Sequence, residues 1–299
     1  MKKLTKAIKN PFWALSVVLR RLLSKYIKDD SLYIKWEYFL EMRKTLNLNS
    51  PQTYNEKLQW LKLNDIHPEY TNLVDKVEVK KIVARAIGEE HVIKTLGVWD
   101  SFEDVNFDAL PDMFVLKTSH DSGGVAICRD KRQECIKAAQ KKIEKSMRRN
   151  YFWEHREYPY RDVKPRIIAE QYMVDESGTE LKDYKIFCFD GEPKVIQVDY
   201  DRFTEHKRNL YDIEWNRLPF TLKFPTDWSR EIPKPEGLQE MLDMARKLSE
   251  GMPHVRVDLY HINGKIYFGE LTFFHGSGHE KFTPEEWNMT FGEWIHINK

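Results

Sequence analysis

The sequence predicts an α+β protein in which antiparallel hairpins follow a helical N-terminal region. Apolar residues recur at helical spacing through residues 1–30 and again through residues 31–87. From residue 111 onward, apolar and polar residues instead alternate around short turns rich in Gly, Asn and Asp. Few helical segments separate these hairpins, and this order is typical of α+β folds rather than of parallel α/β sheets.

The composition indicates a globular, cytoplasmic protein. The 299 residues carry a formal net charge of +1, so no global field favours nucleic acid as a partner. The three cysteines, Cys128, Cys135 and Cys188, have no CxxC spacing, which argues against a disulfide framework or a zinc knuckle. The sequence has no apolar run of the roughly 18 residues that a membrane-spanning helix needs.

Residues 1–30 predict a basic amphipathic helix. They contain eight Lys or Arg and two Asp, with apolar residues on one helical face. This pattern is typical of a helix that lies on a membrane surface, so we expect peripheral association with the inner face of the plasma membrane. A helix that packs on the rest of the protein is the alternative. A secretory signal is disfavoured because Arg20 and Arg21 interrupt the apolar stretch.

A further helix is expected to start at Asp75 as its N-cap and to run to Ile87, with Gly88 as its stop. Lys76 would then lie in the first turn, where a cation opposes the helix dipole. An anion such as phosphate, bound at this N-terminus, would explain that placement.

A strand–loop–strand pattern over residues 113–128 predicts a hairpin with Lys117 at its base and Gly123-Gly124 at its tip. Such a tip can present backbone N–H groups to a phosphate, although a plain turn is the alternative. It is not a P-loop, because no GK[ST] follows and no helix opens there. A basic helix over residues 132–149 comes next.

Strands are expected over residues 166–173, and a second hairpin over residues 183–199 turns at Asp190-Gly191. A basic cluster follows, for which a solvated loop is the alternative reading. Residues 238–250 predict an amphipathic helix that Gly251 stops.

The most strongly patterned stretch is 254–280, where strands alternate around an Asn263-Gly264 turn. Asp258 and Glu270 interrupt the apolar positions, and we expect them to face one another with Arg256 alongside. Two carboxylates on adjacent strands suit Mg²⁺ carrying nucleotide phosphates. A surface hairpin with solvated charges is the alternative.

In this order the segments resemble the ATP-grasp fold, in which two antiparallel-sheet lobes clasp ATP, here with a helical N-terminal region. More narrowly, FVLKTSHDSGG, IIAEQYM, DYKIFCFDGEPKVIQVDYDR, HKRNLYD and VRVDLY…GKIYFGELTFFHGSG resemble the TupA-like ATP-grasp family of bacterial surface-polysaccharide synthesis. The resemblance covers roughly residues 30–297. After the N-terminal helix 1–30, it implies a helical pre-ATP-grasp region 31–110, a lid subdomain 111–172 and a catalytic subdomain 173–299.

The resemblance also implies a role for each matching residue. The expected phosphate-binding lysines are Lys76, Lys117 and Lys185. Adenine is expected at the backbone of Glu170, Gln171 and Tyr172, and ribose at Asp183. The expected Mg²⁺ ligands are Asp258, Glu270 and Thr272; many members have Asn at the last position. Arg256, with Lys185 and Lys117, is expected to act in catalysis.

The acceptor site is expected at residues that can hold an anionic group. These are Arg202, His206, Lys207 and Arg208, together with the loop Gly276, Ser277 and Gly278. His275 and His279 flank this loop, but the intervening glycines disfavour a zinc pair.

The implied function is an ATP- and Mg²⁺-dependent carboxylate–amine ligase that uses an acyl-phosphate intermediate. Its expected substrates are an amino acid and a uronic acid of a bacterial surface polysaccharide or its precursor, with ATP and Mg²⁺ as cofactors. A kinase acting on a sugar hydroxyl, a glycosyltransferase of the same pathway and a non-catalytic binding protein are the alternatives.

Overall fold

The computed structural model describes residues 24, 26–174, 183–201 and 205–297. The α-helices are α3 (Asp30–Met42), α4 (Tyr54–Asn64), α5 (Tyr70–Val74), α6 (Glu78–Ile87), α7 (Gln133–Met147), α8 (Phe152–His155), α9 (Leu238–Ser249) and α10 (Glu286–Glu293). Short 3₁₀ turns are η1 (Glu89–His91), η2 (Phe107–Ala109), η3 (Tyr158–Tyr160) and η4 (His275–Gly278). The strands are β1 (Thr95–Trp99), β2 (Phe114–Thr118), β3 (Val125–Cys128), β4 (Ile167–Gln171), β5 (Asp183–Phe189), β6 (Glu192–Tyr200), β7 (Lys207–Tyr211), β8 (Thr221–Leu222), β9 (His254–Ile262), β10 (Lys265–Thr272) and β11 (Phe282–Thr283).

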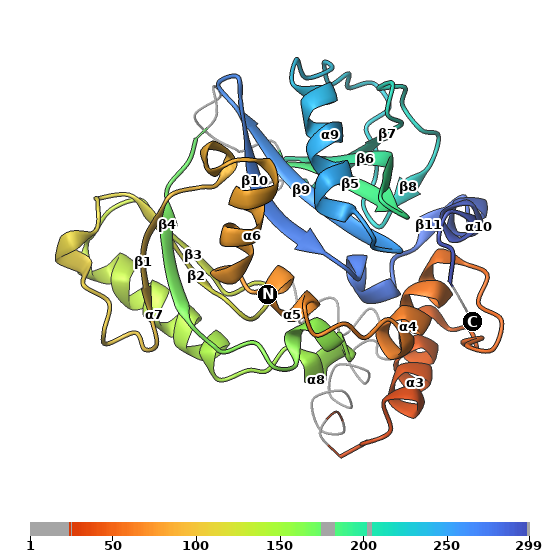
Figure 1. Ribbon diagram of the computed structural model, residues 1–299, viewed down its shortest axis with the longest axis horizontal. Helices are drawn as coiled ribbons and strands as arrows, with labels where there is room; N and C mark the ends of the chain where they lie inside the picture. Colours follow the sequence, from red (N-terminus) through yellow and green to blue (C-terminus); the bar gives the residue numbers. More distant parts are fainter. Residues whose placement is uncertain (1–23, 25, 175–182, 202–204, 298–299) are drawn as a thin grey trace.

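Two antiparallel sheets form the two lobes of the molecule (Figure 1). The smaller sheet has the strand order β1-β4-β2-β3 and the larger has the order β10-β9-β5-β6-β7, while β8 and β11 form a separate pair. The helix α7 packs on the smaller sheet and buries Ala139 and Ile143 against Phe114, Leu116 and other apolar residues of the strands. The α+β class with two antiparallel lobes, expected from the sequence, is therefore confirmed.

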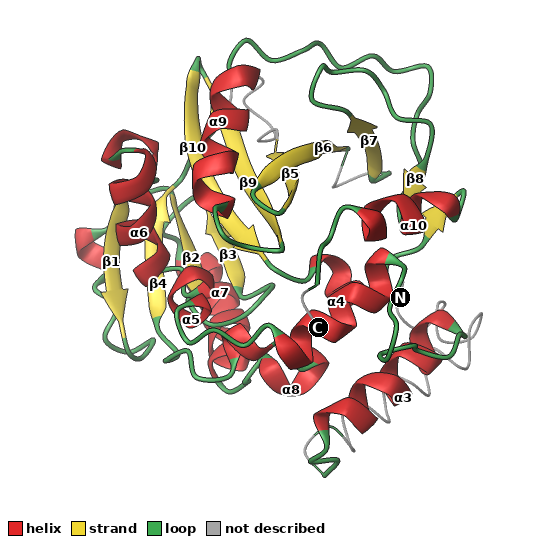
Figure 2. Ribbon diagram, turned by 45° about the vertical axis from the view of Figure 1, so that its right-hand side comes forward, coloured by secondary structure: helices red, strands yellow, loops and turns green. Residues whose placement is uncertain are grey.

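Helices cover both faces of the larger sheet (Figure 2). On one face, α6 and α9 bury Val83 and Met241 against Val257 and its apolar neighbours. On the other face, α4, α5 and α10 enclose an aromatic cluster that includes Phe187 and Phe291. The second face is apolar only over part of the sheet, and the remainder carries the polar side chains described below.

The hairpin over β9 and β10 forms as the sequence predicts. Asn263 and Gly264 both adopt positive φ, 51° and 77°, as an Asn-Gly turn requires. Asp258 and Glu270 are direct partners across the two strands. A shift in register between Phe268 and Glu270 leaves Gly269 as an extra residue, and a Cβ there would lie 3.0 Å from the Asp258 carbonyl oxygen.

Two local expectations need correction. The helix α6 begins at Glu78 with Val77 as its cap residue, so Lys76 precedes the helix rather than lying in its first turn. Asp75 does accept a hydrogen bond, from the Val77 N–H at 2.9 Å, and Gly88 does end the helix. In addition, β1 lies within the region expected to be helical but pairs with β4, so the smaller lobe begins before residue 111.

The helix expected over residues 1–30 lies almost entirely outside the described residues, as does Arg202. Among the helices that the structure describes, none combines the length and hydropathy that crossing a membrane requires.

Candidate active site

A polar row crosses three neighbouring strands of the larger sheet. Side chains alternate between the faces of a strand, so the positions that flank Val257 point away from the α6–α9 core. Arg256 and Asp258 therefore share a face with Lys185, which is the direct partner of Asp258 on β5. On the opposite side Glu270 is the partner of Asp258 on β10. The strand register alone thus places Lys185, Asp258 and Glu270 side by side.

Asp258 is the centre of a buried ion-pair network. Arg256 binds it with two parallel hydrogen bonds, Nε to Oδ1 and Nη2 to Oδ2, each 2.6 Å long. Lys185 Nζ lies 2.6 Å from Asp258 Oδ2 and also pairs with Asp183. Asp183, Lys185, Arg256 and Asp258 are all at most 9% exposed, so this geometry is well shielded from water. The remaining guanidinium nitrogen of Arg256, Nη1, donates to His275 Nδ1.

Glu270 is the exposed member of the row, with 51% of its side chain accessible. Its Oε1 lies 3.3 Å from Arg256 Nη2, and the Thr272 hydroxyl lies 3.1 Å from the same nitrogen. Two carboxylates and a hydroxyl on neighbouring positions are the oxygen donors that Mg²⁺ prefers, so the set Asp258, Glu270 and Thr272 fits this ion by type. Glu270 offers an accessible carboxylate, whereas both oxygens of Asp258 already accept from Lys185 and Arg256.

A pocket between the two lobes adjoins this row. Its lining includes Phe268 to Leu271 of β10 and polar side chains from the other lobe and from the α6 region: Lys76, Lys80, Lys117 and Glu170. Lys80 and Lys117 each lie 2.6 Å from a different oxygen of the Glu170 carboxylate. Burial raises the pKa of Glu170, but Lys117 and Lys80 lower it by more, and the net pKa lies below its ordinary value.

The residue preceding α6 meets the glycine hairpin. Lys76 Nζ donates to the Asp121 carbonyl oxygen at 2.5 Å, and its backbone N–H donates to the Ser119 carbonyl oxygen at 3.1 Å. The Asp121 side chain, 1% exposed, accepts from the Thr118 and Ser146 hydroxyls. It also accepts from the Gly124 N–H at 3.3 Å, so it holds the hairpin tip in place beside Lys76.

Sequence reasoning missed Lys80 and Asp121, and it misjudged Glu170. The expectation for Glu170 concerned its backbone, which instead lies inside the ladder between β1 and β2, while its side chain points into the pocket. Gln171 and Tyr172 follow at the end of β4 and line the crevices beside it. The sequence did contain a signal for Lys80: it follows the buried Val79 at the edge of the apolar face of α6, where a lysine can lie against a neighbouring element.

The basic cluster expected to bind the acceptor is not a free positive patch. Arg208 is 4% exposed and donates to Asp199 Oδ1 at 2.7 Å and to Glu280 Oε2 at 3.2 Å, so it is a structural ion-pair residue. His206 stacks on the Phe224 ring at a centroid distance of 3.8 Å. Lys207 lies 3.4 Å from Asp227 and is accessible at the edge of the sheet.

The loop Gly276, Ser277 and Gly278 has three consecutive residues with φ between 54° and 69°. Ser277 is buried, its hydroxyl donates to Glu157 Oε1 at 2.5 Å, and its carbonyl oxygen accepts from Gln59 and Lys62. A Cβ at Gly278 would lie 2.5 Å from Gln59 Nε2. Contrary to the expectation of an anion site at this loop, Ser277 faces α4 and stabilises the packing of that helix.

Comparison with known proteins finds one family and several similar solved structures. A family described as TupA-like ATPgrasp matches residues 56–296. Similar solved structures include D-alanine–D-alanine ligase from Bacillus anthracis complexed with ATP, with 19% identity and a TM-score of 0.41 over 68% of this chain and 54% of that chain. The corresponding ligase from Helicobacter pylori has 16% identity and a TM-score of 0.42 over 81% of this chain and 69% of that chain. The same kind of ligase from Coxiella burnetii has 13% identity and a TM-score of 0.43 over 81% of this chain and 64% of that chain.

This chain thus spans about half the length of the Bacillus anthracis ligase. No curated protein matches. The family match covers most of the chain and includes every strand of both lobes. The chain belongs to the TupA-like ATP-grasp family.

Proposed function

We propose that this protein is an ATP- and Mg²⁺-dependent carboxylate–amine ligase, which joins an amino acid to a uronic acid of a bacterial surface polysaccharide or its precursor. The observation that carries the proposal is the convergence of lysines from the smaller lobe and the α6 region on the row Arg256, Asp258 and Glu270. Membership in an ATP-grasp family supports the general activity. The resemblance to proteins of surface-polysaccharide synthesis supports the choice of acceptor.

The proposed reaction has two steps. A carboxylate oxygen of the acceptor attacks the γ-phosphorus of ATP, the bond from that phosphorus to the bridging oxygen breaks, and ADP leaves. The amine then attacks the acyl carbon, inorganic phosphate leaves, and the nitrogen loses a proton to give the amide. Phosphoryl transfer needs alignment and charge stabilisation more than covalent help from the protein.

The residues of the pocket supply those two needs. Lys117 of the smaller lobe and Lys76 of the α6 region hold the phosphates, Lys80 adds a third cation, and Glu170 fixes the positions of Lys80 and Lys117. Arg256 stabilises the negative charge that develops on the transferred group and on the acyl carbon's oxygen.

The remaining side chains of the row hold the metal and the ribose. Asp258, Glu270 and Thr272 would hold Mg²⁺, which when bound offsets the charge of the phosphates. Lys185 adds a phosphate contact, and Asp183 at the start of β5 is the proposed acceptor of ribose hydroxyls.

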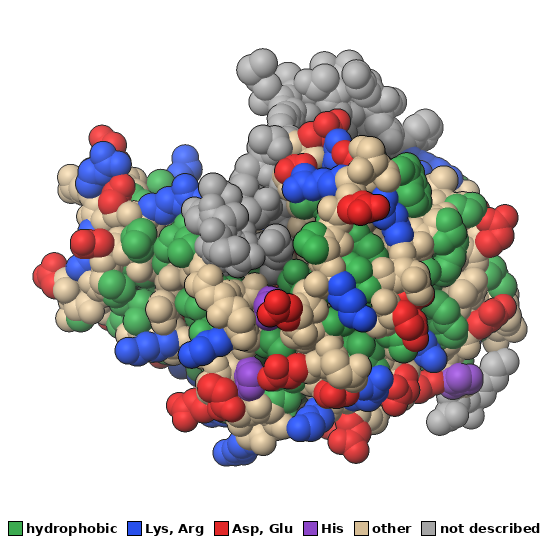
Figure 3. Space-filling view, turned by 90° about the horizontal axis from the view of Figure 1, so that it is seen from above, with side chains coloured by type: hydrophobic (Ala, Val, Ile, Leu, Met, Phe, Trp, Pro, Cys, Tyr) green, Lys and Arg blue, Asp and Glu red, His purple; other side chains and the backbone are tan. Residues whose placement is uncertain are grey.

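The acceptor side of the site rests on fewer residues. His206 and Lys207 remain candidates for holding the acceptor carboxylate, since both lie at the edge of the polar sheet face. Figure 3 shows basic and acidic side chains interspersed over one face of the described residues. Residues 1–30 would place the enzyme at the inner face of the plasma membrane, where lipid-linked glycans are assembled.

The test is release of ADP and phosphate from Mg·ATP against a panel of uronic acids, each with and without mixed amino acids. A ligase releases both products only when a carboxylate and an amine are present together. ADP release with a hydroxyl acceptor and without free phosphate would establish a kinase instead. Absence of ATP binding by calorimetry would refute the nucleotide site itself.

A further inference from the structure

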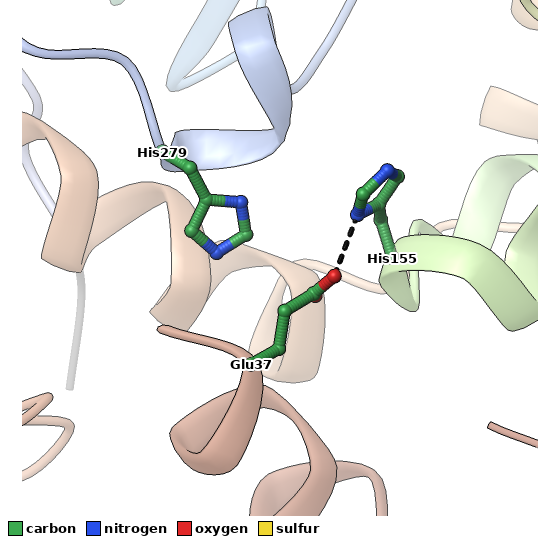
Figure 4. Close-up of side chains that lie close together, drawn as sticks. All are labelled: Glu37, His155 and His279. Carbon is green, nitrogen blue, oxygen red and sulfur yellow. Dashed lines mark hydrogen bonds and ion pairs between the residues drawn. The ribbon is translucent and has the colours of Figure 1, made fainter. Parts of the chain in front are cut away.

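A second cluster of metal-ligating side chains lies outside the nucleotide pocket. Glu37 of α3, His155 at the end of α8 and His279 just after η4 each offer one ligand atom, and these atoms all lie within 4.8 Å of one another. Figure 4 shows the Glu37 carboxylate reaching between the two imidazole rings. These three residues are 118 and 124 positions apart along the chain (155 − 37 and 279 − 155), so only the fold brings them together.

The surroundings of this cluster are buried and polar. Glu37 is completely buried, and His155 has 19% of its side chain exposed. Two further charged side chains, Glu157 and Lys62, are buried in the same region. A bound cation would lie beside the buried Glu37 carboxylate and offset its charge.

The donor set indicates which cation would bind. Two imidazole nitrogens and one carboxylate oxygen form the set typical of zinc sites that keep a fourth position for water. Magnesium and calcium prefer sites made of oxygen, so two histidines favour a transition metal.

The geometry requires only a small adjustment. His155 Nδ1 and Glu37 Oε1 are 2.8 Å apart, whereas two ligands of one tetrahedral zinc ion with bonds of about 2.0 Å lie about 3.3 Å apart. The ligand atoms of the three residues all lie within 4.8 Å of one another, so side-chain rotations would bring the more distant of them closer by at most about 1.5 Å. We propose that Glu37, His155 and His279 bind one zinc ion, which fixes the helical N-terminal region to both α8 and the segment that follows η4.

The proposal is tested by zinc binding to the full chain after removal of metal with a chelator and of any histidine tag. The wild type is expected to bind about one equivalent of Zn²⁺ in competition with a chromophoric chelator. His155→Gln and His279→Gln should each weaken this binding at least tenfold, whereas His296→Gln, a control at an exposed histidine, should leave it unchanged. Failure of the wild type to bind, or binding that neither variant alters, would overturn the proposal.

A spectroscopic measurement on the wild type covers the case in which the variants do not fold. X-ray absorption of the zinc-loaded protein should show nitrogen and oxygen neighbours at about 2.0 Å with the multiple-scattering pattern of two imidazoles. Sulfur neighbours at about 2.3 Å, or a shell of oxygen without imidazole, would place the ion elsewhere and refute this site.

Discussion

Replacement of Glu170 by Gln tests the charge arrangement of the nucleotide pocket. The carboxylate lies 2.6 Å from Lys80 and 2.6 Å from Lys117, and the three side chains are 6%, 13% and 20% exposed. Because the two lysines hold the pKa of Glu170 below its ordinary value, the group is ionised at neutral pH. The Gln side chain has nearly the same shape, so the substitution removes a charge without leaving a cavity.

The expected loss in the free energy of unfolding is about 3 kcal/mol. A hydrogen bond to a charged partner contributes about 1.5–3 kcal/mol and a neutral one about 0.5–1.5 kcal/mol, so two weakened bonds cost about 2–3 kcal/mol. The amide also presents an N–H₂ group to one of the lysines, and Lys80 and Lys117 then repel each other without a carboxylate between them. Removal of one partner from a buried pair typically costs about 3–5 kcal/mol, and the partial exposure of Lys117 places this site at the lower limit.

Urea unfolding followed by circular dichroism at pH 7.5 measures this loss. A matched control is Glu192→Gln, which breaks a pair with Arg246 whose side chains are 59% and 35% exposed, and which should change stability by less than about 1 kcal/mol. If Glu170→Gln destabilises the protein no more than the control does, with an unchanged dependence on urea, the two ion pairs contribute nothing and our description of the pocket is wrong.

Three further substitutions separate catalytic from structural roles. Glu270→Gln should lower Mg·ATP turnover at least a hundredfold and leave the melting temperature unchanged, because the side chain is half exposed; unchanged turnover would contradict its metal role. Arg208→Gln should lower the free energy of unfolding by about 3 kcal/mol, because it leaves Asp199 and Glu280 without their shared cation. It should not change the KM for the acceptor. A raised KM with unchanged stability would instead support the substrate-binding role expected from the sequence. Burial lowers the pKa of His254 to about 3, against about 6.5 in an unfolded chain. Below pH 6.5 the unfolded state therefore binds a proton that the folded state does not. The free energy of unfolding should fall by about 1.4 kcal/mol per pH unit as the pH drops from 6.5 toward 4. His254→Gln should reduce that slope by the same amount in urea titrations at pH 7 and pH 5, and an unaltered slope would show that other groups cause the acid sensitivity.

The sequence predicted the hairpin and the two facing acids, but not the bulge that brings the acids together. Counted from the Asn263-Gly264 turn, strict alternation places Gly269 opposite Asp258, and the bulge at Gly269 moves Glu270 into that position. The pairing of Lys185 with Asp258 follows from a non-local contact between β5 and β9, and the resemblance to a family gave these residues separate roles without predicting that they pair.

Other features depend on how distant elements dock, which local patterns do not encode. In the sequence Arg208 belongs to a basic run that suggests a solvated loop, but in the structure it is buried and pairs with Glu280, 72 residues away. The role of Lys80 depends on which side of α6 faces the smaller lobe, and that is decided by packing of the helix on the larger sheet. The grouping of Glu37, His155 and His279 likewise has no local signature, since each comes from a different element.

The charges of the pocket indicate how it selects the nucleotide complex. The pocket and the adjoining polar row together carry five basic side chains and four acidic ones: Lys76, Lys80, Lys117, Lys185 and Arg256 against Glu170, Asp183, Asp258 and Glu270. Five cations against four carboxylates leave a surplus of one positive charge, and most of the lysines already have acidic partners. Free ATP carries about four negative charges and would reverse the sign of the site, whereas a complex with Mg²⁺ carries about two and is nearly balanced. When Lys185 turns from Asp258 to a phosphate, the carboxylate it leaves needs a new cation, and the metal is the group that supplies one. The pocket should therefore bind the nucleotide and the metal together more strongly than either alone, because the phosphate binds Lys185 and the metal binds the Asp258 carboxylate that Lys185 has left.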